Sequence, residues 1–526
     1  MKPLESFLAI AFIALAAVVG WLLFYDATAT EDRQVAAEAN GATPLTRDPV
    51  ASSRSGQSAK KSSNVTMEDV LLGIPGERLV RFGSEEDYQA FLESLNGSGL
   101  RLLGQLDALR VARIGYDSIS DLDDFLGDLE NEANYLVTVP GIPDSGSVQA
   151  GAIGFGDSVL EWLGVTGDNS AWGEGVKIAI IDSGISAHDA LPGNILHLDL
   201  TQGGPNDFLN GHGTAVASLI AGESAIITGL SPSASLIDVR VANGDGESSS
   251  FLLAQGILAA VDAGADLINI SMGSYGDSIV VRDAVAYAES AGVAVVASSG
   301  NEGYDQPAWP ANIAEVTAVG SVDANGDLVD FSNTGENLDL VAPGLQIYAA
   351  WLDGKYVEFT GTSASAPLVV ASAATVMSEF DLSAQAAVDY VINYASEGGY
   401  PGLDEDYGNG VLNVGTTINS QTKGIYDLAA VSNYIDDNGD LLVTVQNQGT
   451  ETFSNSSLTV FANGLSSSFN VPNLAPTETE TFTIPANIDP EDGFLIESEV
   501  TINGAYEDAN PYNDAKVSEQ DPLFDE

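Results

Sequence analysis

The sequence contains no cysteine and few basic residues, and both shortages narrow what the protein can be. Among 526 residues there are 17 lysines and arginines against 75 aspartates and glutamates, which gives a formal net charge of −58 at pH 7. Without cysteine there can be no disulfide, no thiolate nucleophile and no cysteine-ligated zinc. Because a surface this acidic repels nucleic acid and anionic membranes, we expect no nucleic-acid partner. It should also attract cations, and salt should relieve its self-repulsion.

Missing motifs narrow the chemistry further. The chain has no zinc-binding or phosphate-cradling pattern, and Ser363 lies in G-T-S-A-S rather than in the G-x-S-x-G of α/β-hydrolase esterases. The acidic turns at residues 243–247 and 323–327 carry oxygen atoms that suit calcium, but neither follows the twelve-residue EF-hand spacing. Because short acidic turns are common in so acidic a chain, a solvated loop is the simpler interpretation, and we assign no metal ligand.

Three short motifs are present, and they follow one another in a fixed order. They are IAIIDSGI around Asp182, NGHGTAVAS around His212 and TGTSASAP around Ser363. A serine hydroxyl is a poor nucleophile until a base takes its proton, and a buried acid must hold that base in one tautomer. Each motif alone could be a strand end, a tight turn or a helix cap. Together they favour an acid, a base and a nucleophile that act as one site.

The local patterns place these residues at the ends of predicted elements. Residues 176–181 form an apolar run of strand length, and Asp182 stands at its carboxyl end. The glycines on both sides of His212 permit close backbone approach, and a buried helix is expected after it. Ser363 precedes a helix of small residues, so free backbone N–H groups lie beside its hydroxyl and can donate to an oxyanion.

A fourth motif, SSGNEG, follows a predicted buried strand at Ala294–Ser298 and places Asn301 just beyond its end. A carboxamide N–H at that point could stabilise the negative charge that develops on a scissile carbonyl oxygen. The alternative is that Asn301 is a plain turn residue between glycines.

These motifs resemble those of the subtilisin-like serine proteases, the subtilase family or peptidase family S8, over about residues 150–420. The order Asp, His, Ser along the chain is that of the family. The resemblance implies a parallel sheet flanked by helices. It also implies that Asp182 orients the base, His212 is the general base and acid, Ser363 is the nucleophile and Asn301 supplies an oxyanion donor. The intact GHGT disfavours the sedolisins, which replace the histidine with a carboxylate.

The resemblance implies further roles. Ser271, Met272 and Gly273, after the strand-like ADLINI, look like the substrate-binding segment of the family. His188 looks like the histidine that follows the family's acid, and we interpret it as structural. His197 has no motif around it and is expected to be a surface or packing residue. The chemistry needs no cofactor, and structural calcium is compatible with the resemblance.

The first 65 residues indicate export. Residues 7–25 are almost wholly apolar, with Lys2 before them and acidic residues after them, so the rest of the chain should face outward. We interpret residues 1–29 as a signal peptide or a signal-anchor helix, which would make an amino-terminal membrane anchor. Residues 30–65 are rich in Ala, Ser, Thr and Gly without a period and are expected to be a disordered linker.

Residues 66–142 are predicted to form a small α/β domain. Strand patterns at 79–82, 109–116 and 135–139 alternate with two helical patterns, one starting near Ser84 and one at 122–129. This β-α-β-α-β order resembles the inhibitory propeptide of subtilases (inhibitor I9), a ferredoxin-like α/β fold. In that family the domain is removed by the enzyme itself, and the segment after Val139 has the flexible composition of a processing site. The alternative is a permanent small binding domain.

After the catalytic region the pattern changes to short alternating strands separated by Asn, Asp, Gly and Pro turns. Residues 425–520 are therefore predicted to form an all-β, Ig-like sandwich. The order of its strands and turns resembles that of bacterial CARDB modules. This resemblance implies a spacer or a binding module rather than a catalyst.

Two functions from different classes fit the sequence. The first is a serine endopeptidase made as a proenzyme, monomeric, acting on polypeptides, and secreted or anchored on the outer side of a bacterial cytoplasmic membrane. The second is a surface adhesion or binding protein whose protease-like domain is silent. The intact set of Asp182, His212, Ser363 and Asn301 favours the first.

Overall fold

The computed structural model describes residues 72–520, except 142, 144–147, 150, 202–209, 437, 453–454, 463, 490–492 and 504–505. The chain divides into two compact units, Met1–Ser62 and Ser63–Glu526, and every described residue lies in the second. The predicted signal or anchor segment and the linker lie outside the described residues. Within the described part of the chain, no helix is both long and apolar enough to cross a membrane.

The catalytic region is built on a seven-stranded sheet in which every neighbouring pair of strands is parallel. The strand order is β12-β11-β10-β9-β5-β7-β6. The strands are β5 (Lys177–Asp182), β6 (Leu196–Asp199), β7 (Ser235–Arg240), β9 (Leu267–Ile270), β10 (Ala294–Ser298), β11 (Val316–Val322) and β12 (Leu340–Pro343).

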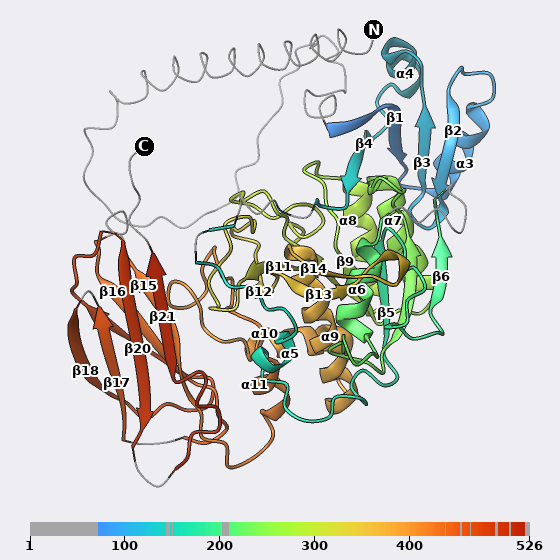
Figure 1. Ribbon diagram of the computed structural model, residues 1–526. Coiled ribbons are helices and arrows are strands. Elements are labelled where there is room, and N and C mark those ends of the chain that lie inside the picture. Colours follow the sequence, from blue (N-terminus) through green and yellow to red (C-terminus); the bar gives the residue numbers. More distant parts are fainter. Residues whose placement is uncertain are drawn as a thin grey trace, which may run out of the picture. The chain divides into compact units, whose positions relative to one another are not determined.

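Helices cover both faces of this sheet, as predicted (Figure 1). Helices α6 (His212–Ala221) and α9 (Thr362–Phe380) share one core with the sheet, and α7 (Ser250–Asp262) and α8 (Ile279–Ser290) share the other. The remaining elements of the region are α5 (Val159–Trp162), β8 (Glu247–Ser249), β13 (Ile347–Ala350), η4 (Leu352–Gly354), β14 (Tyr356–Phe359), α10 (Ala384–Asn393) and α11 (Val414–Asn419).

Strand β5 shows why the sheet positions its polar residues so firmly. Its residues alternate between the two cores: Ile178 and Ile180 pack on the side of α6 and α9, and Ala179 and Ile181 pack on the side of α7 and α8. Because a parallel strand buried on both faces reads as a continuous apolar run, the pattern at 176–181 predicts this strand well. The alternation puts Asp182 on the face that α6 covers.

The N-terminal domain, described from residue 72 to 141, has one more strand than the sequence predicts. Its elements are β1 (Gly73–Arg81), α3 (Glu85–Ser94), β2 (Arg101–Leu106), η2 (Asp107–Leu109), β3 (Val111–Gly115), α4 (Ile119–Leu126) and β4 (Asn131–Thr138). They form an antiparallel sheet in the order β2-β3-β1-β4-β8, with β8 contributed by the catalytic region. The predicted β-α-β-α-β order missed β2, because Leu102 and Leu103 are both exposed and the strand lacks a buried face.

The C-terminal domain is a sandwich of two antiparallel sheets, as predicted. One sheet has the order β15-β16-β19 and the other β18-β17-β20-β21. The strands are β15 (Leu428–Ile435), β16 (Leu441–Asn447), β17 (Ser456–Ala462), β18 (Leu465–Val471), β19 (Thr479–Ile484), β20 (Phe494–Ile502) and β21 (Ala515–Gln520). Alternate residues such as Val443, Val460 and Ile496 point inward and form one shared core.

Candidate active site

Asp182 and His212 form a buried hydrogen-bonded pair. Asp182 is the last residue of β5 and His212 the first of α6, and His212 Nδ1 lies 3.0 Å from Oδ1 and 2.9 Å from Oδ2 of Asp182. The two side chains are 0% and 3% exposed. Because Nδ1 donates to the carboxylate, Nε2 is left as the proton acceptor, and it has no hydrogen-bond partner among the described residues.

The glycines beside His212 allow this close approach. A Cβ on Gly213 would lie 2.7 Å from the carbonyl oxygen of Gly184, and a Cβ on Gly211 would lie 2.5 Å from the Trp351 ring. The imidazole is also held by Phe359, whose ring packs edge-on at 5.1 Å between centroids. The motif GHG therefore fixes the base by packing as well as by its hydrogen bond.

Ser363 is the second residue of α9 and is buried. Its Oγ donates to the carbonyl oxygen of Ser271 at 3.3 Å, and Ser271 Oγ donates back to the carbonyl oxygen of Ser363 at 3.3 Å. The structure thus brings Ser363 to the predicted substrate segment without a hydrogen bond to His212. Catalytic hydrogen bonds are often long or misaligned before substrate binds, so this arrangement is compatible with a nucleophilic Ser363.

Asn301 is fixed so that its amide N–H groups remain available. Its Oδ1 accepts hydrogen bonds from the backbone N and from Oγ1 of Thr362, both at 2.9 Å, whereas Nδ2 donates no hydrogen bond within the described part of the chain. Gly361 has a φ of 130°, and a Cβ there would lie 2.7 Å from Asn301 Nδ2. The carboxamide therefore contacts the residues that directly precede Ser363.

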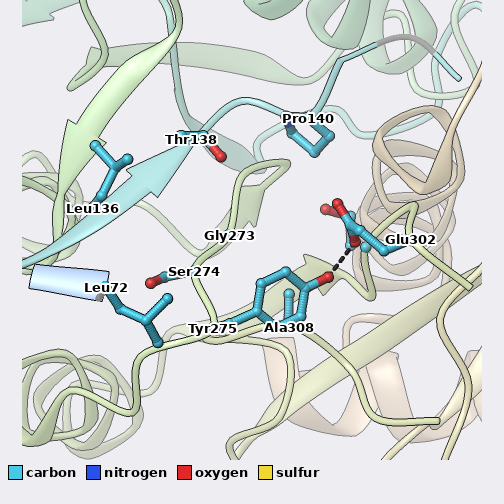
Figure 2. Close-up of a pocket in the computed structure, with 11 residues that line it drawn as sticks. Leu72, Leu136, Thr138, Pro140, Gly273, Ser274, Tyr275, Glu302 and Ala308 are labelled. Atoms are coloured by element: carbon cyan, nitrogen blue, oxygen red, sulfur yellow. Dashed lines mark hydrogen bonds between the residues drawn. The ribbon is translucent and has the colours of Figure 1, made fainter. Parts of the chain in front are cut away.

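A cleft of about 200 Å³ lies beside these residues, and it is lined from both domains (Figure 2). From the catalytic region, Gly273, Ser298 and Gly300 line it; of the predicted substrate segment, Gly273 lines the cleft and Ser271 does not. From the N-terminal domain, Leu136, Thr138 and Pro140 line it. Met272 points into the core and is fully buried.

The end of β4 enters this cleft as an extra strand. Thr138 N donates to Gly273 O at 2.9 Å, and Gly273 N donates to Thr138 O at 3.0 Å. On its other edge β4 pairs with β8, with Leu136 opposite Ser249. The main chain of residues 136–138 therefore lies between two edges of the catalytic region, which is how an extended peptide binds to a sheet edge.

Side chains of the N-terminal domain also cap two helices of the catalytic region. Glu132 accepts hydrogen bonds from Ser278 Oγ at 2.6 Å, Ile279 N at 2.7 Å and Val280 N at 3.2 Å, all at the start of α8. Asn134 Oδ1 accepts from Phe251 N at 3.0 Å at the start of α7. Burial raises the pKa of Glu132, although these hydrogen bonds oppose that shift.

Three polar residues at and beside the cleft were not among the predicted site residues. Tyr275 OH donates to Glu302 Oε2, as Figure 2 shows, and Asn333 Nδ2 donates to Tyr275 OH at 2.9 Å. Glu302 Oε2 also accepts from Asn301 N at 2.9 Å. Burial first, then the Glu302 carboxylate, raises the pKa of the Tyr275 hydroxyl. Only Glu302 could have been suspected from the sequence, because it follows Asn301 directly.

The other two histidines differ from each other. His188 Nδ1 accepts from Ala190 N at 3.0 Å and its Nε2 lies 3.1 Å from Lys355 O, which is a structural arrangement with the backbone. His197, for which no partner was predicted, has its Nδ1 2.7 Å from Oδ2 of the buried Asp238. It is therefore more than a packing residue.

The two acidic turns considered for calcium direct their oxygens inward. Asn243 Oδ1 accepts from the backbone N of Asp245 and of Glu247, both at 2.9 Å. In the second turn, Asp323 Oδ1 accepts from Asn325 N at 2.8 Å and Asp327 N at 3.0 Å. Among the described residues, no group of three or more acidic, histidine or cysteine side chains is arranged to hold a metal ion.

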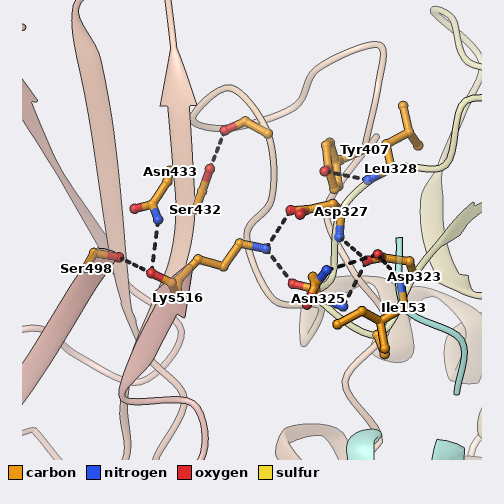
Figure 3. A network of polar contacts seen from close by, with 12 residues as sticks. Ile153, Asp323, Asn325, Asp327, Leu328, Tyr407, Ser432, Asn433, Ser498 and Lys516 are labelled. Carbon is orange, nitrogen blue, oxygen red and sulfur yellow. Dashed lines mark hydrogen bonds and ion pairs between the residues drawn. The ribbon is translucent and has the colours of Figure 1, made fainter. Parts of the chain in front are cut away.

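An ammonium group occupies the second turn instead (Figure 3). Lys516 of β21 donates from Nζ to Asn325 O at 2.7 Å and to Asp327 Oδ1 at 3.0 Å. The same turn holds the start of the catalytic region, because Asp323 Oδ2 accepts from Ile153 N at 2.9 Å. Lys516 thus connects the C-terminal domain to the catalytic region at this turn.

Comparisons with known proteins agree on two parts of the chain. Residues 173–410 match the family described as the subtilase family, and residues 426–510 match the family described as CARDB. Subtilisin BL of Lederbergia lenta is 36% identical over 253 residues, which cover 46% of this chain and 90% of that protein. The thermostable alkaline protease of Halalkalibacterium halodurans is 33% identical over 255 residues, covering 46% and 68%.

A solved structure shares the fold. The epidermin leader peptide processing serine protease of Staphylococcus aureus aligns with a TM-score of 0.55 and 20% identity, over 66% of this chain and 99% of that one. At so low an identity the likeness concerns the fold alone.

Proposed function

This chain belongs to the subtilase family, and from that premise we propose that it is an exported serine endopeptidase, made as a proenzyme, with Ser363 as its nucleophile. The observation that carries the proposal is the buried Asp182–His212 pair, whose Nε2 is left without a partner. A buried imidazole with one nitrogen fixed and the other free is the arrangement that general-base catalysis requires.

The proposed reaction begins when a peptide carbonyl lies against Ser363. Ser363 Oγ forms a bond to the carbonyl carbon while His212 Nε2 takes the hydroxyl proton, and Asp182 stays ionised and stabilises the imidazolium. The negative charge moves to the carbonyl oxygen, where Asn301 Nδ2 and the backbone N of Ser363 donate hydrogen bonds. Losing one such donor lowers kcat by about a hundred- to a thousandfold, a range known from subtilisin itself.

The second half of the reaction releases both products. The tetrahedral intermediate collapses, the C–N bond breaks, and His212 gives its proton to the leaving amine. Water then attacks the acyl-enzyme, with His212 again taking a proton, and Ser363 is regenerated as the carboxylic product leaves. These steps use only groups of the chain and water.

The N-terminal domain is proposed to be the inhibitory propeptide. Residues 136–138 pair with Gly273 and β8 in the position that an extended substrate would take, so substrate and this strand compete for one site. Cleavage by the enzyme itself between about residues 140 and 155 would separate the domain from residues 150–420. The apolar segment at residues 7–25 is proposed to export the chain, as a cleaved signal or as an outward-facing anchor.

The experiment that tests this proposal compares intact mass and amino-terminal sequence for wild type, Ser363→Ala and Ser365→Ala, at low and high salt. We expect wild type and Ser365→Ala to lose the residues up to about 140–155 and Ser363→Ala to remain whole. Ser365 is the matched control, because it lies on the same helix, is buried, and bonds only to Ala342 O. Wild type that stays intact and resists fluorophosphonate labelling in every salt would refute the protease proposal.

A further inference from the structure

A second histidine–carboxylate pair lies on β6 and β7, the two strands beyond β5 in the sheet. Strands β6, β7 and β5 are neighbours, and His197, Asp238 and Ile180 stand opposite one another across them. His197 Nδ1 is 2.7 Å from Asp238 Oδ2. The histidine side chain is 55% exposed and the aspartate side chain 3%. One end of this pair therefore reaches solvent while the other lies in the core.

Asp238 is an unusual residue for this sheet. Of the seven strands, only β7 has a carboxylate at a position other than its last residue. Along the strand, Asp238 lies between Ile237 and Val239. Its Oδ1 has no hydrogen-bond partner among the described residues. Burying a carboxylate is costly even when His197 compensates one of its oxygens, so a purely packing role would be better filled by an apolar side chain.

The register places Asp238 on the same face as the Asp182–His212 pair. In a parallel sheet, side chains at paired positions share a face, so Asp238 lies on the side of Ile180 that α6 covers, and Asp182 is two residues beyond Ile180. The two carboxylates interact electrostatically, because the charge of Asp182 contributes to the raised pKa of Asp238. Burial is the larger cause of that shift.

Asp238 also contacts the turn that follows Asp182. The backbone N–H of Ile185 is close enough to Asp238 to lower the pKa of its carboxyl. Within the same turn, Ser183 Oγ accepts from the backbone N of Gly213, the residue after His212. The turn therefore connects Asp238 with both members of the first pair.

We propose that His197 and Asp238 position the turn that carries Asp182 and set the net charge next to the Asp182–His212 pair. This inference rests on the proposed function and makes both residues positioning residues, because neither touches the reacting groups. When His197 is protonated, the ion pair is neutral. When it loses its proton, a negative charge remains in the core beside Asp182, unless Asp238 takes up a proton.

Few other charges lie on the elements around this pair. Strand β5 contributes Asp182 and, at its far end, Lys177, and α6 contributes His212. Arg240 of β7 and Asp199 of β6 form an ion pair at 3.3 Å, and the turn after Asp182 carries His188 and Asp189. The hydrogen bond to Asp238 raises the pKa of His197. The net charge of the His197–Asp238 pair therefore changes from neutral to negative above the pH at which an ordinary histidine titrates.

The chain contains only three histidines, so NMR can follow each imidazole in the full-length Ser363→Ala protein. We expect His197 to titrate above an ordinary histidine and its pKa to fall in Asp238→Asn. In His197→Gln, the uncompensated Asp238 charge should move the acid limb of kcat/KM to higher pH by about 0.5 pH unit or more, and it should change the His212 imidazole resonances of the Ser363→Ala protein. The double variant His197→Gln, Asp238→Asn should restore both.

His188→Gln is the control, because its imidazole bonds only to backbone groups and should leave His212 unchanged. The inference is overturned if His197 titrates normally, or if the His212 imidazole resonances of Ser363→Ala are the same with and without His197→Gln. Since His197 is half-exposed, that variant should fold. The titrations need no activity, so a failed inference can be told apart from a failed protease proposal.

Discussion

The N-terminal and C-terminal domains both contact the catalytic region, but they use different chemical groups. The N-terminal domain inserts main chain into the cleft, with Thr138 and Gly273 exchanging two backbone hydrogen bonds. The C-terminal domain uses side chains: besides Lys516, Gln448 Nε2 donates to Ser396 Oγ at 2.8 Å, and Asn413 Nδ2 donates to Gln448 Oε1 at 3.0 Å.

This difference suggests two fates for the two domains. A strand that lies in the cleft competes with substrate, so its contact must end before the site can work on other peptides. The side-chain contacts of the C-terminal domain lie on residues that do not line the cleft, so they can persist throughout catalysis. Under the proposed function, the N-terminal domain is removed and the C-terminal domain remains.

The largest expected effect comes from Glu132→Ala. It removes a carboxylate that accepts three hydrogen bonds at the start of α8, and hydrogen bonds to charged groups contribute about 1.5–3 kcal/mol each. We expect the cleaved N-terminal domain to bind the processed enzyme about a hundredfold more weakly, measured as its inhibition constant. The control is Glu130→Ala, since Glu130 is exposed and its side chain pairs with Arg81 of its own domain. Equal inhibition constants would contradict the role of Glu132.

A smaller effect, of about 2 kcal/mol, is expected for Lys516→Met. The substitution keeps the aliphatic stem and removes the ammonium from Asn325 O and Asp327, so calorimetry should show lower stability of the processed protein. The exposed Lys355–Asp353 pair provides the control variant Lys355→Met. If both variants lower stability alike, Lys516 has no special part in holding the domain.

The C-terminal domain should also depend on pH. Burial, with the nearby Asp508 and Asp514 carboxylates, raises the pKa of Asp427 to about 7. Because this folded-state pKa lies above the unfolded value, the stabilising contribution is complete below about pH 4 and is lost as pH rises through about 7. We expect the free energy of unfolding to fall over that window in denaturant titrations. Asp427→Asn should abolish it, whereas the exposed Asp436→Asn should not.

The smallest effect is expected for Asp283→Asn. Arg81 Nη1 and Asp283 Oδ2 are 2.7 Å apart across the N-terminal interface, with side chains 31% and 34% exposed. Such pairs contribute about 0.2–1 kcal/mol, so the inhibition constant should change about twofold. The change should vanish at high salt. A loss as large as that of Glu132→Ala would mean that surface charge, not the buried cap, holds the N-terminal domain.

Much of the fold followed from local pattern. The strand at 176–181 and the helices after His212 and Ser363 carry their signal in contiguous apolar or small residues, which is the kind of information a sequence displays. Strand β2 was missed because it is stabilised by pairing with β3 and buries little of its own surface. Pairing between distant segments leaves no periodicity in either one.

The residues of the candidate site also differ in whether a local motif marks them. Asp182, His212, Ser363 and Asn301 each lie within a motif that can be found without knowing its partners. Tyr275 and Asn333 are 58 residues apart, and His197 and Asp238 are 41 apart, with no repeated pattern to connect them. Those contacts depend on how strands and turns meet in space, so only the structure could reveal them.

The buried side chain of Met272 has a consequence for resistance to oxidants. Peroxide damages proteins first at thiols and accessible thioethers. The chain has no thiol, and the residue after Ser363 is an alanine, which carries no sulfur. The thioether of Met272, in the predicted substrate segment, is 0% exposed. The groups that carry the proposed chemistry are a hydroxyl, an imidazole, a carboxylate and an amide. We therefore expect the proposed proteolytic activity to persist at peroxide concentrations that inactivate enzymes with exposed sulfur atoms in their active sites.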